Sequence, residues 1–163
     1  MRTLTLVFFM SIFHLSISAQ NATMTNDRLA TIIQSMADSV GGQEGQWSFK
    51  IGEMWFVCFT DTNHDRMRIM TPIIDVAAME AGEMERCLKA NFHTALDVKY
   101  CIADDILWSA FIHPLGALKE DQVIDAVKQV FSASATFGTL YSSSELVFPG
   151  AQKEEKKKRV DRT

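Results

Sequence analysis

The sequence predicts an α+β fold in which a five-stranded antiparallel sheet is packed by helices, with the element order α-βββ-α-ββ-α. Stretches with the alternating apolar pattern of half-buried strands follow one another through short polar turns, first as a block of three and then as a block of two. Stretches with the apolar spacing of amphipathic helices precede, separate and follow these blocks. Strands joined by short turns favour an antiparallel sheet over a wound parallel one.

The first helix is expected to run from Thr25 or Asn26 to about Ser39. Either residue can accept a hydrogen bond at the helix start, and the apolar residues that follow recur at the spacing of one helix face. Gly41 and Gly42 are expected to end this helix, because glycine commonly follows the last helical turn.

Three strands are expected next, at residues 47–51, 54–60 and 67–74, as an antiparallel meander. The loop between the second and third strands, residues 61–65, is rich in turn formers. Pro72 cannot donate a backbone hydrogen bond, so we expect the third strand to be an edge strand at this point or to carry a bulge.

The second half is predicted to contain a helix over residues 80–95 and strands at residues 98–103 and 106–112. A last helix begins near Lys119 and either continues through residue 137 or breaks near Gly138.

Residues 1–19 are expected to be a secretory signal peptide. Arg2 supplies a short positive region, an apolar run follows, and the segment ends in the small residues Ser18 and Ala19. The apolar run is shorter than the about 20 residues that span a bilayer. Cleavage after Ala19, or alternatively after Ser18, predicts a periplasmic or secreted protein with no stable membrane insertion once the signal is removed.

Residues 25–150 are expected to form a single α+β domain, and residues 151–163 a disordered charged tail. Residues 20–152 carry 9 Lys and Arg against 17 Asp and Glu, a net charge of −8, whereas residues 153–163 have a net charge of +3. An acidic body argues against nucleic acid as a partner, because that binding depends on neutralising phosphates.

The three cysteines, Cys58, Cys87 and Cys101, lie in apolar surroundings. Free cysteine often packs as a small apolar side chain, so buried thiols are favoured. An exported chain can also form a disulfide, and a Cys87–Cys101 or a Cys58–Cys101 bridge is the alternative.

No catalytic residue, cofactor or metal site is predicted. Asp61, Asn63 and Asp65 have the spacing that begins a calcium loop, but Arg66 and Pro72 stand where such a loop needs Gly and Glu. A hairpin loop is therefore the better interpretation. The Cys and His residues show none of the close pairs of a zinc site, and no Ser lies in a G-x-S-x-G motif.

The segment at residues 100–123 reads YCIADDILWSAFIHPLGALKEDQV. It combines a strand, an acidic turn, a strand that ends in a Pro-Leu turn, and a helix start. With the element order, it resembles the YbjN / type III secretion chaperone-like group over about residues 28–137. The resemblance implies a curved antiparallel sheet packed by helices, often as a homodimer. It also implies protein binding rather than catalysis, and the group has no catalytic residues to transfer.

The candidate partner-binding residues are Trp55, Met67, Met70 and Trp108. Met side chains can serve adaptable binding surfaces, and a sheet that is apolar on both faces needs a cover, which a partner can supply. We therefore predict an exported, non-enzymatic protein-binding or chaperone-like module of the cell envelope.

The alternative is a small-ligand-binding or enzymatic domain built on the same sheet. It requires a deep pocket that is lined by Trp47, Trp55, Tyr100 or Trp108 and contains a convergent polar group.

Overall fold

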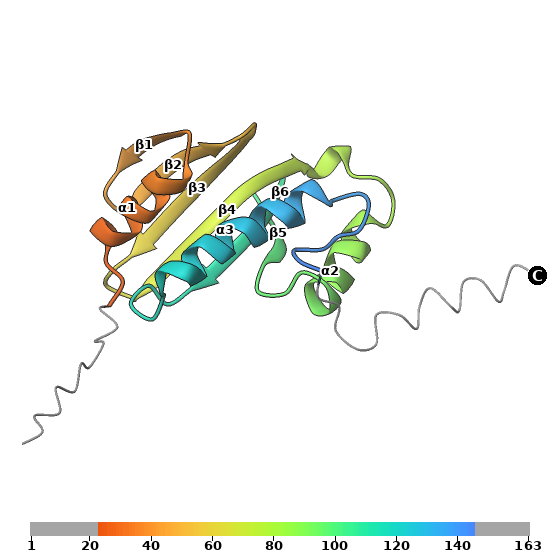
Figure 1. Cartoon of the computed structure of the whole chain (residues 1–163). Coiled ribbons are helices and arrows are strands. Elements are labelled where there is room, and N and C mark those ends of the chain that lie inside the picture. Colours follow the sequence, from red (N-terminus) through yellow and green to blue (C-terminus); the bar gives the residue numbers. More distant parts are fainter. Residues whose placement is uncertain (1–22, 146–163) are drawn as a thin grey trace, which may run out of the picture.

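The computed structural model describes residues 23–145 (Figure 1). The expected signal peptide at residues 1–19 and the expected tail at residues 151–163 lie outside the described residues. The elements, in chain order, are α1 (Asn26–Met36), β1 (Ser39–Gln43), β2 (Gln46–Ile51), β3 (Met54–Asp61), β4 (Arg66–Asp75), the 3₁₀ helix η1 (Val76–Ala78), α2 (Glu83–His93), β5 (Lys99–Ala103), β6 (Ile106–His113) and α3 (Glu120–Ala135).

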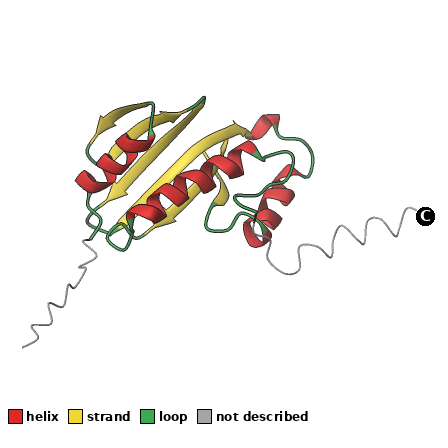
Figure 2. Ribbon diagram, in the orientation of Figure 1, coloured by secondary structure: helices red, strands yellow, loops and turns green. Residues whose placement is uncertain are grey.

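The strands form one antiparallel sheet with the order β1-β2-β3-β4-β6-β5. Helices α1 and α3 lie over the same face of this sheet, and α2 lies near β5 at one end (Figure 2). The α+β class and the antiparallel sheet are confirmed. The expected five strands are wrong, because the sheet has six and the element order becomes α-ββββ-α-ββ-α.

The additional strand, β1, occupies the segment where the sequence predicted the end of a helix. Helix α1 starts as expected, with the Thr25 side chain accepting a hydrogen bond from the backbone N–H of Arg28, but it ends at Met36. The chain then pairs with β2, and Gly42 lies inside the new strand with φ of +111°. A Cβ on Gly42 would lie 2.3 Å from the carbonyl oxygen of Gln46, so this glycine permits the tight β1–β2 hairpin.

Pro72 lies in β4 beyond the last residue pair with β3, Val57 and Met70, and pairs only with Trp108 of β6, so the strand is locally an edge at this point, as expected. The alternative expectation of a bulge is also confirmed, because the β4–β6 register shifts between Pro72 and Ile74. The bulge accommodates a residue that has no N–H to donate to the ladder.

The core lies between one face of the sheet and helices α1 and α3. Phe49 and Phe56, which are fully buried on neighbouring strands, stack with ring centroids 5.1 Å apart. Two buried hydroxyls connect the sheet to α3. The Tyr100 hydroxyl donates to the carbonyl of Ala133 at 2.7 Å, and the Ser109 hydroxyl donates to that of Val130 at 3.0 Å.

The later elements follow the sequence prediction with shifted ends. Helix α2 begins at Glu83 rather than residue 80, directly after Gly82 in the left-handed conformation. Helix α3 ends at Ala135, so of the two expectations the break before Gly138 is the one observed. Tyr141 then packs against Phe137 and Tyr100, which holds residues 136–145 beside α2 and α3.

The cysteines are all free thiols, so neither alternative disulfide is present. Cys58 and Cys87 are buried as expected, and burial raises the pKa of Cys58 to about 12 and that of Cys87 to about 11. Cys101 is exposed, contrary to expectation. It neighbours the buried Tyr100 in β5, and alternation along the strand turns its side chain to the other face of the sheet.

Candidate protein-binding surface

The face of the sheet opposite α1 and α3 is called the open face here. Successive side chains of a strand point to opposite faces. The neighbours of the core residues Phe49, Phe56 and Ile69 therefore point to the open face. The strand register arranges its side chains in cross-strand rows. Two rows are continuous over several strands: Ser48, Val57, Met70, Ala110 and Lys99; and Gln46, Phe59, Arg68 and Ile112. Two shorter rows are Lys50 with Trp55, and Pro72 with Trp108 and Cys101.

The open face exposes large apolar side chains. Trp55, Phe59 and Ile112 have 52%, 38% and 55% of their surface exposed, respectively. Met70 and Ala110 lie between them and are buried, although neither belongs to the core cluster on the helix side. Neighbouring strands are about 4.8 Å apart, so the apolar patch extends about 15 Å across strands β3, β4, β6 and β5.

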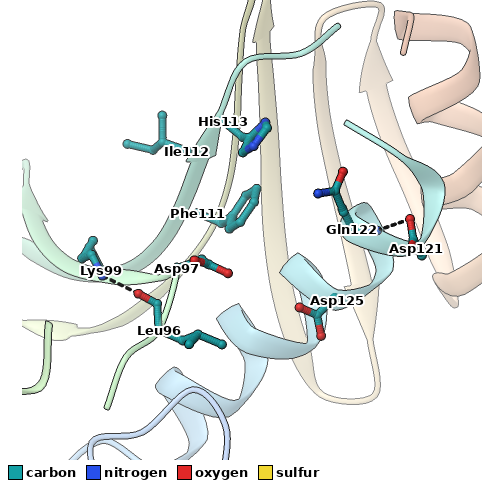
Figure 3. A pocket seen from close by; sticks show the side chains of 9 residues that line it. All are labelled: Leu96, Asp97, Lys99, Phe111, Ile112, His113, Asp121, Gln122 and Asp125. Atoms are coloured by element: carbon teal, nitrogen blue, oxygen red, sulfur yellow. Dashed lines mark hydrogen bonds between the residues drawn. The ribbon is translucent and has the colours of Figure 1, made fainter. Parts of the chain in front are cut away.

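Alternation between the two faces is visible in strand β6 (Figure 3). Ile112 points away from α3, whereas its neighbours Phe111 and His113 point towards that helix. Phe111 is correspondingly buried in the core and Ile112 is exposed.

Three of the four residues predicted to bind a partner lie together on the open face. Trp55, Met70 and Trp108 come from the neighbouring strands β3, β4 and β6. Met67 does not join them, because it faces α3, is 1% exposed and belongs to the core cluster. Met67 and Met70 are three residues apart in one strand, and an odd spacing places two side chains on opposite faces.

Sequence reasoning missed Phe59 and Ile112, which belong to the same patch. Each lies an even number of residues along its strand from a predicted member, Trp55 for Phe59 and Trp108 for Ile112. Strand alternation was the signal that could have found both residues.

The charged side chains of the six strands all occupy positions on the open face. They are Lys50, Arg66, Arg68 and Lys99, which are basic, and Asp61 and Asp75, which are acidic. These six strand positions sum to a net charge of +2, although the Lys99 ammonium turns back to the carbonyls of Asn91 and Leu96. Residues 23–145 together contain nine Lys and Arg and 17 Asp and Glu. Four of the nine Lys and Arg among residues 23–145 thus occupy positions on this face.

Arg68 lies at the centre of this positive charge. Its partners across the strands are Phe59 on one side and Ile112 on the other. Its charge also reaches Cys101, where burial raises the pKa of the thiol and the charge of Arg68 opposes that rise. Asp61, in contrast, is engaged in its own turn. Its carboxylate lies 2.6 Å from Nδ1 of His64, and this hydrogen bond lowers the pKa of Asp61.

Two further apolar surfaces lie on the helices. On α2, Met84, Leu88 and Phe92 recur every four residues and are 46%, 64% and 75% exposed. Between α1 and α3, a groove of about 380 Å³ is lined mainly by apolar side chains, among them Met36 and Phe131. These two surfaces are the alternative candidate sites for binding a partner.

The pocket that the enzymatic or small-ligand alternative requires is not formed by the predicted residues. Trp47 and Tyr100 are buried on the helix side, while Trp55 and Trp108 point to the open face. The four side chains are thus divided between the two faces of the sheet.

A different groove, of about 720 Å³, lies between β6 and the start of α3 (Figure 3). Its side chains include three carboxylates, Asp97, Asp121 and Asp125. The Gln129 amide donates to Asp125 at 2.7 Å and to Asp97 at 3.4 Å.

The basic groups of this groove are also engaged in the fold. Lys99 donates to the backbone carbonyls of Asn91 and Leu96, and Nδ1 of His113 lies 2.8 Å from the carbonyl oxygen of Pro114. Among residues 23–145, no group of three or more His, Cys, Asp and Glu could hold a metal ion. Asp97, Asp125, Lys99 and His113 of this groove thus form hydrogen bonds with neighbouring groups of the fold.

No family model matches the chain, and no curated protein matches it. Among solved structures, the fold is similar to that of a chain in the crystal structure of the ExsC–ExsE complex. The likeness has a TM-score of 0.52 at 8% sequence identity, and it covers 70% of this chain and 96% of the other. The likeness is one of fold. It supports the α+β architecture with an antiparallel sheet, while membership of the YbjN / type III secretion chaperone-like group stays a prediction.

Within residues 23–145, no helix has the length and apolar character needed to cross a bilayer.

Proposed function

We propose that this protein is an exported, non-enzymatic protein-binding module of the cell envelope, with a chaperone-like fold, and that its open face binds the partner. The observation that carries this proposal is the patch around Trp55, Phe59 and Ile112, which no described helix or loop covers. Large exposed apolar patches on soluble domains commonly mark interaction sites.

The composition of the patch suits protein binding. Trp and Arg are the residues most enriched where binding energy concentrates at protein interfaces, and the open face has Trp55, Trp108 and Arg68 on adjacent strands. Trp55 exposes about half of its surface, and covering it would contribute about 2–3 kcal/mol of apolar burial. The structural neighbour is part of a two-protein complex, which supports a binding role for this fold.

Site-specific photocrosslinking tests the proposal with a matched pair of positions. Phe59 on the open face and Phe131 on α3 are the same residue type and are 38% and 42% exposed, but they lie on opposite sides of the molecule. Benzoylphenylalanine fits either position with little change in shape. We expect irradiation of cells of the native host to yield a covalent adduct with another protein from position 59 and none from position 131.

Two other outcomes would contradict the proposal. An adduct from position 131 alone would move the binding site to the groove between α1 and α3. Equal adducts from both positions would indicate non-specific capture of apolar surface.

The homodimer implied by the resemblance stays a prediction. Light scattering over a range of concentrations tests it directly. The Leu88→Glu variant, which places a charge in the exposed stripe of α2, determines whether that stripe carries any self-association.

A further inference from the structure

We propose that the partner presents an acidic, apolar segment to the open face, and that Arg68 is the main residue that selects its charge. This inference rests on the proposed function, since it takes the open face as the binding site and adds the chemistry of what binds there. It follows from the position of the basic side chains relative to the apolar patch.

Arg68 is placed where a bound segment must pass. It stands between Phe59 and Ile112 in one cross-strand row, and all three side chains are exposed. The side chain of Arg68 makes no ion pair or hydrogen bond within residues 23–145. A bound segment with a carboxylate beside apolar side chains would give this guanidinium a partner. Charge-assisted hydrogen bonds between Arg and a carboxylate are among the stronger hydrogen bonds in proteins.

The other basic groups of the open face border the same patch. Lys50 lies opposite Trp55 on the neighbouring strand, and its ammonium is 3.2 Å from Glu53, whose side chain is almost fully exposed. Such an exposed pair contributes little and is easily exchanged. The Arg66 side chain donates to backbone carbonyls of its own loop and stands opposite Asp61 across the strands, with no ion pair within residues 23–145.

Charge disfavours the basic C-terminal residues 153–163 and the expected signal peptide as occupants of this face. Residues 153–163 carry a net charge of +3 and would meet a face of charge +2. Residues 1–19 are apolar, but their single charged residue is Arg2. Like charges across an interface oppose binding.

Charge also disfavours two copies that meet through their open faces. In a twofold contact through this face, both contacting surfaces would carry the same basic strand positions. The face is therefore better matched to a different protein with carboxylates set among apolar side chains.

Selection from a displayed library of random peptides of about 12 residues, which reach about 40 Å when extended, tests the inference. The full chain is the bait, and Trp55→Ser is the parallel bait whose open face has lost a central side chain. We expect peptides that depend on Trp55 to be enriched in Asp and Glu together with aromatic or aliphatic residues.

The affinity of a selected peptide, measured by fluorescence anisotropy, then isolates the role of Arg68. Arg68→Glu should weaken binding about tenfold or more, and Arg68→Ala should weaken it less. The matched control is Lys128→Glu, which reverses an exposed charge on α3 and should change the affinity less than about twofold. Circular dichroism of each variant confirms that it is folded.

The outcomes separate this inference from the proposed function. Peptides that depend on Trp55 but show no acidic bias, or bind Arg68→Glu as well as the wild type, would overturn the inference and leave the open face as the binding site. Peptides that bind the Trp55→Ser bait equally well would overturn both.

Discussion

Two tryptophans on adjacent strands test whether the open face is uncovered in the free protein. Trp47 in β2 is 7% exposed and packs in the core, whereas Trp55 in β3 is 52% exposed and points to the open face. Replacing each with alanine removes the same atoms from opposite sides of one sheet.

The two substitutions should differ clearly in their cost. Removing a buried Trp typically costs about 3–5 kcal/mol of unfolding free energy, and we expect this range for Trp47→Ala. Trp55 keeps only about half of its surface in contact with the protein, so Trp55→Ala should cost about 1–2 kcal/mol.

Urea unfolding followed by circular dichroism measures the difference. With a slope of about 2 kcal/mol per molar urea, a difference of about 2.5 kcal/mol separates the two midpoints by about 1 M. Equal losses would refute the reasoning, because they would mean that Trp55 is covered in the free protein. The open face would then be an internal contact or a contact between copies rather than a free surface.

Three further predictions test other parts of the account. Mass spectrometry of the purified protein from an exporting host should find Gln20 at the N-terminus, and retention of Met1 would contradict export through a cleaved signal. Because burial raises the pKa of Cys58 from 9.0 to about 12, the folded state holds this proton more tightly than the unfolded state, and the unfolding free energy should fall as the pH rises above about 9. Urea unfolding at several pH values measures this fall in the unfolding free energy. In Cys58→Ala the fall should be smaller than in the wild type by up to about 1.4 kcal/mol per pH unit. An equal fall in the two proteins would contradict the raised pKa. Gly42→Ala should destabilise the protein by about 1–3 kcal/mol, since φ is +111° and the new Cβ would meet a carbonyl oxygen, whereas Gly41→Ala should cost less than about 0.5 kcal/mol in the same denaturation assay.

Much of the sheet could be predicted because its strands carry a clear alternation. Trp47, Phe49 and Ile51 alternate with polar residues, and they form β2 with the two aromatic side chains in the core. Strand β1 was not predictable in this way. Its sequence, Ser-Val-Gly-Gly-Gln, has low strand propensity, and its pairing with β2 supplies the stability that the local sequence lacks.

The apolar surface that we propose as the binding site could be predicted in outline, but not residue by residue. The sequence indicated an excess of apolar residues around the meander, and Trp55, Met70 and Trp108 do share a face. Met67 was grouped with them by proximity along the chain, although strand geometry places it on the helix side. The role of Arg68 could not be seen from the sequence, because it depends on a register that brings residues from three strands into one row.

The most direct test of the account uses the indole N–H signals of the three tryptophans in a two-dimensional nitrogen–proton NMR spectrum. When the protein captured at position 59, or a selected acidic peptide, is added to labelled protein, the signals of Trp55 and Trp108 should shift. The signal of Trp47, which is buried on the other face, should stay in place. A shift of Trp47 alone, or a partner that binds without moving Trp55 or Trp108, would contradict the claim that the open face of the sheet is the binding site.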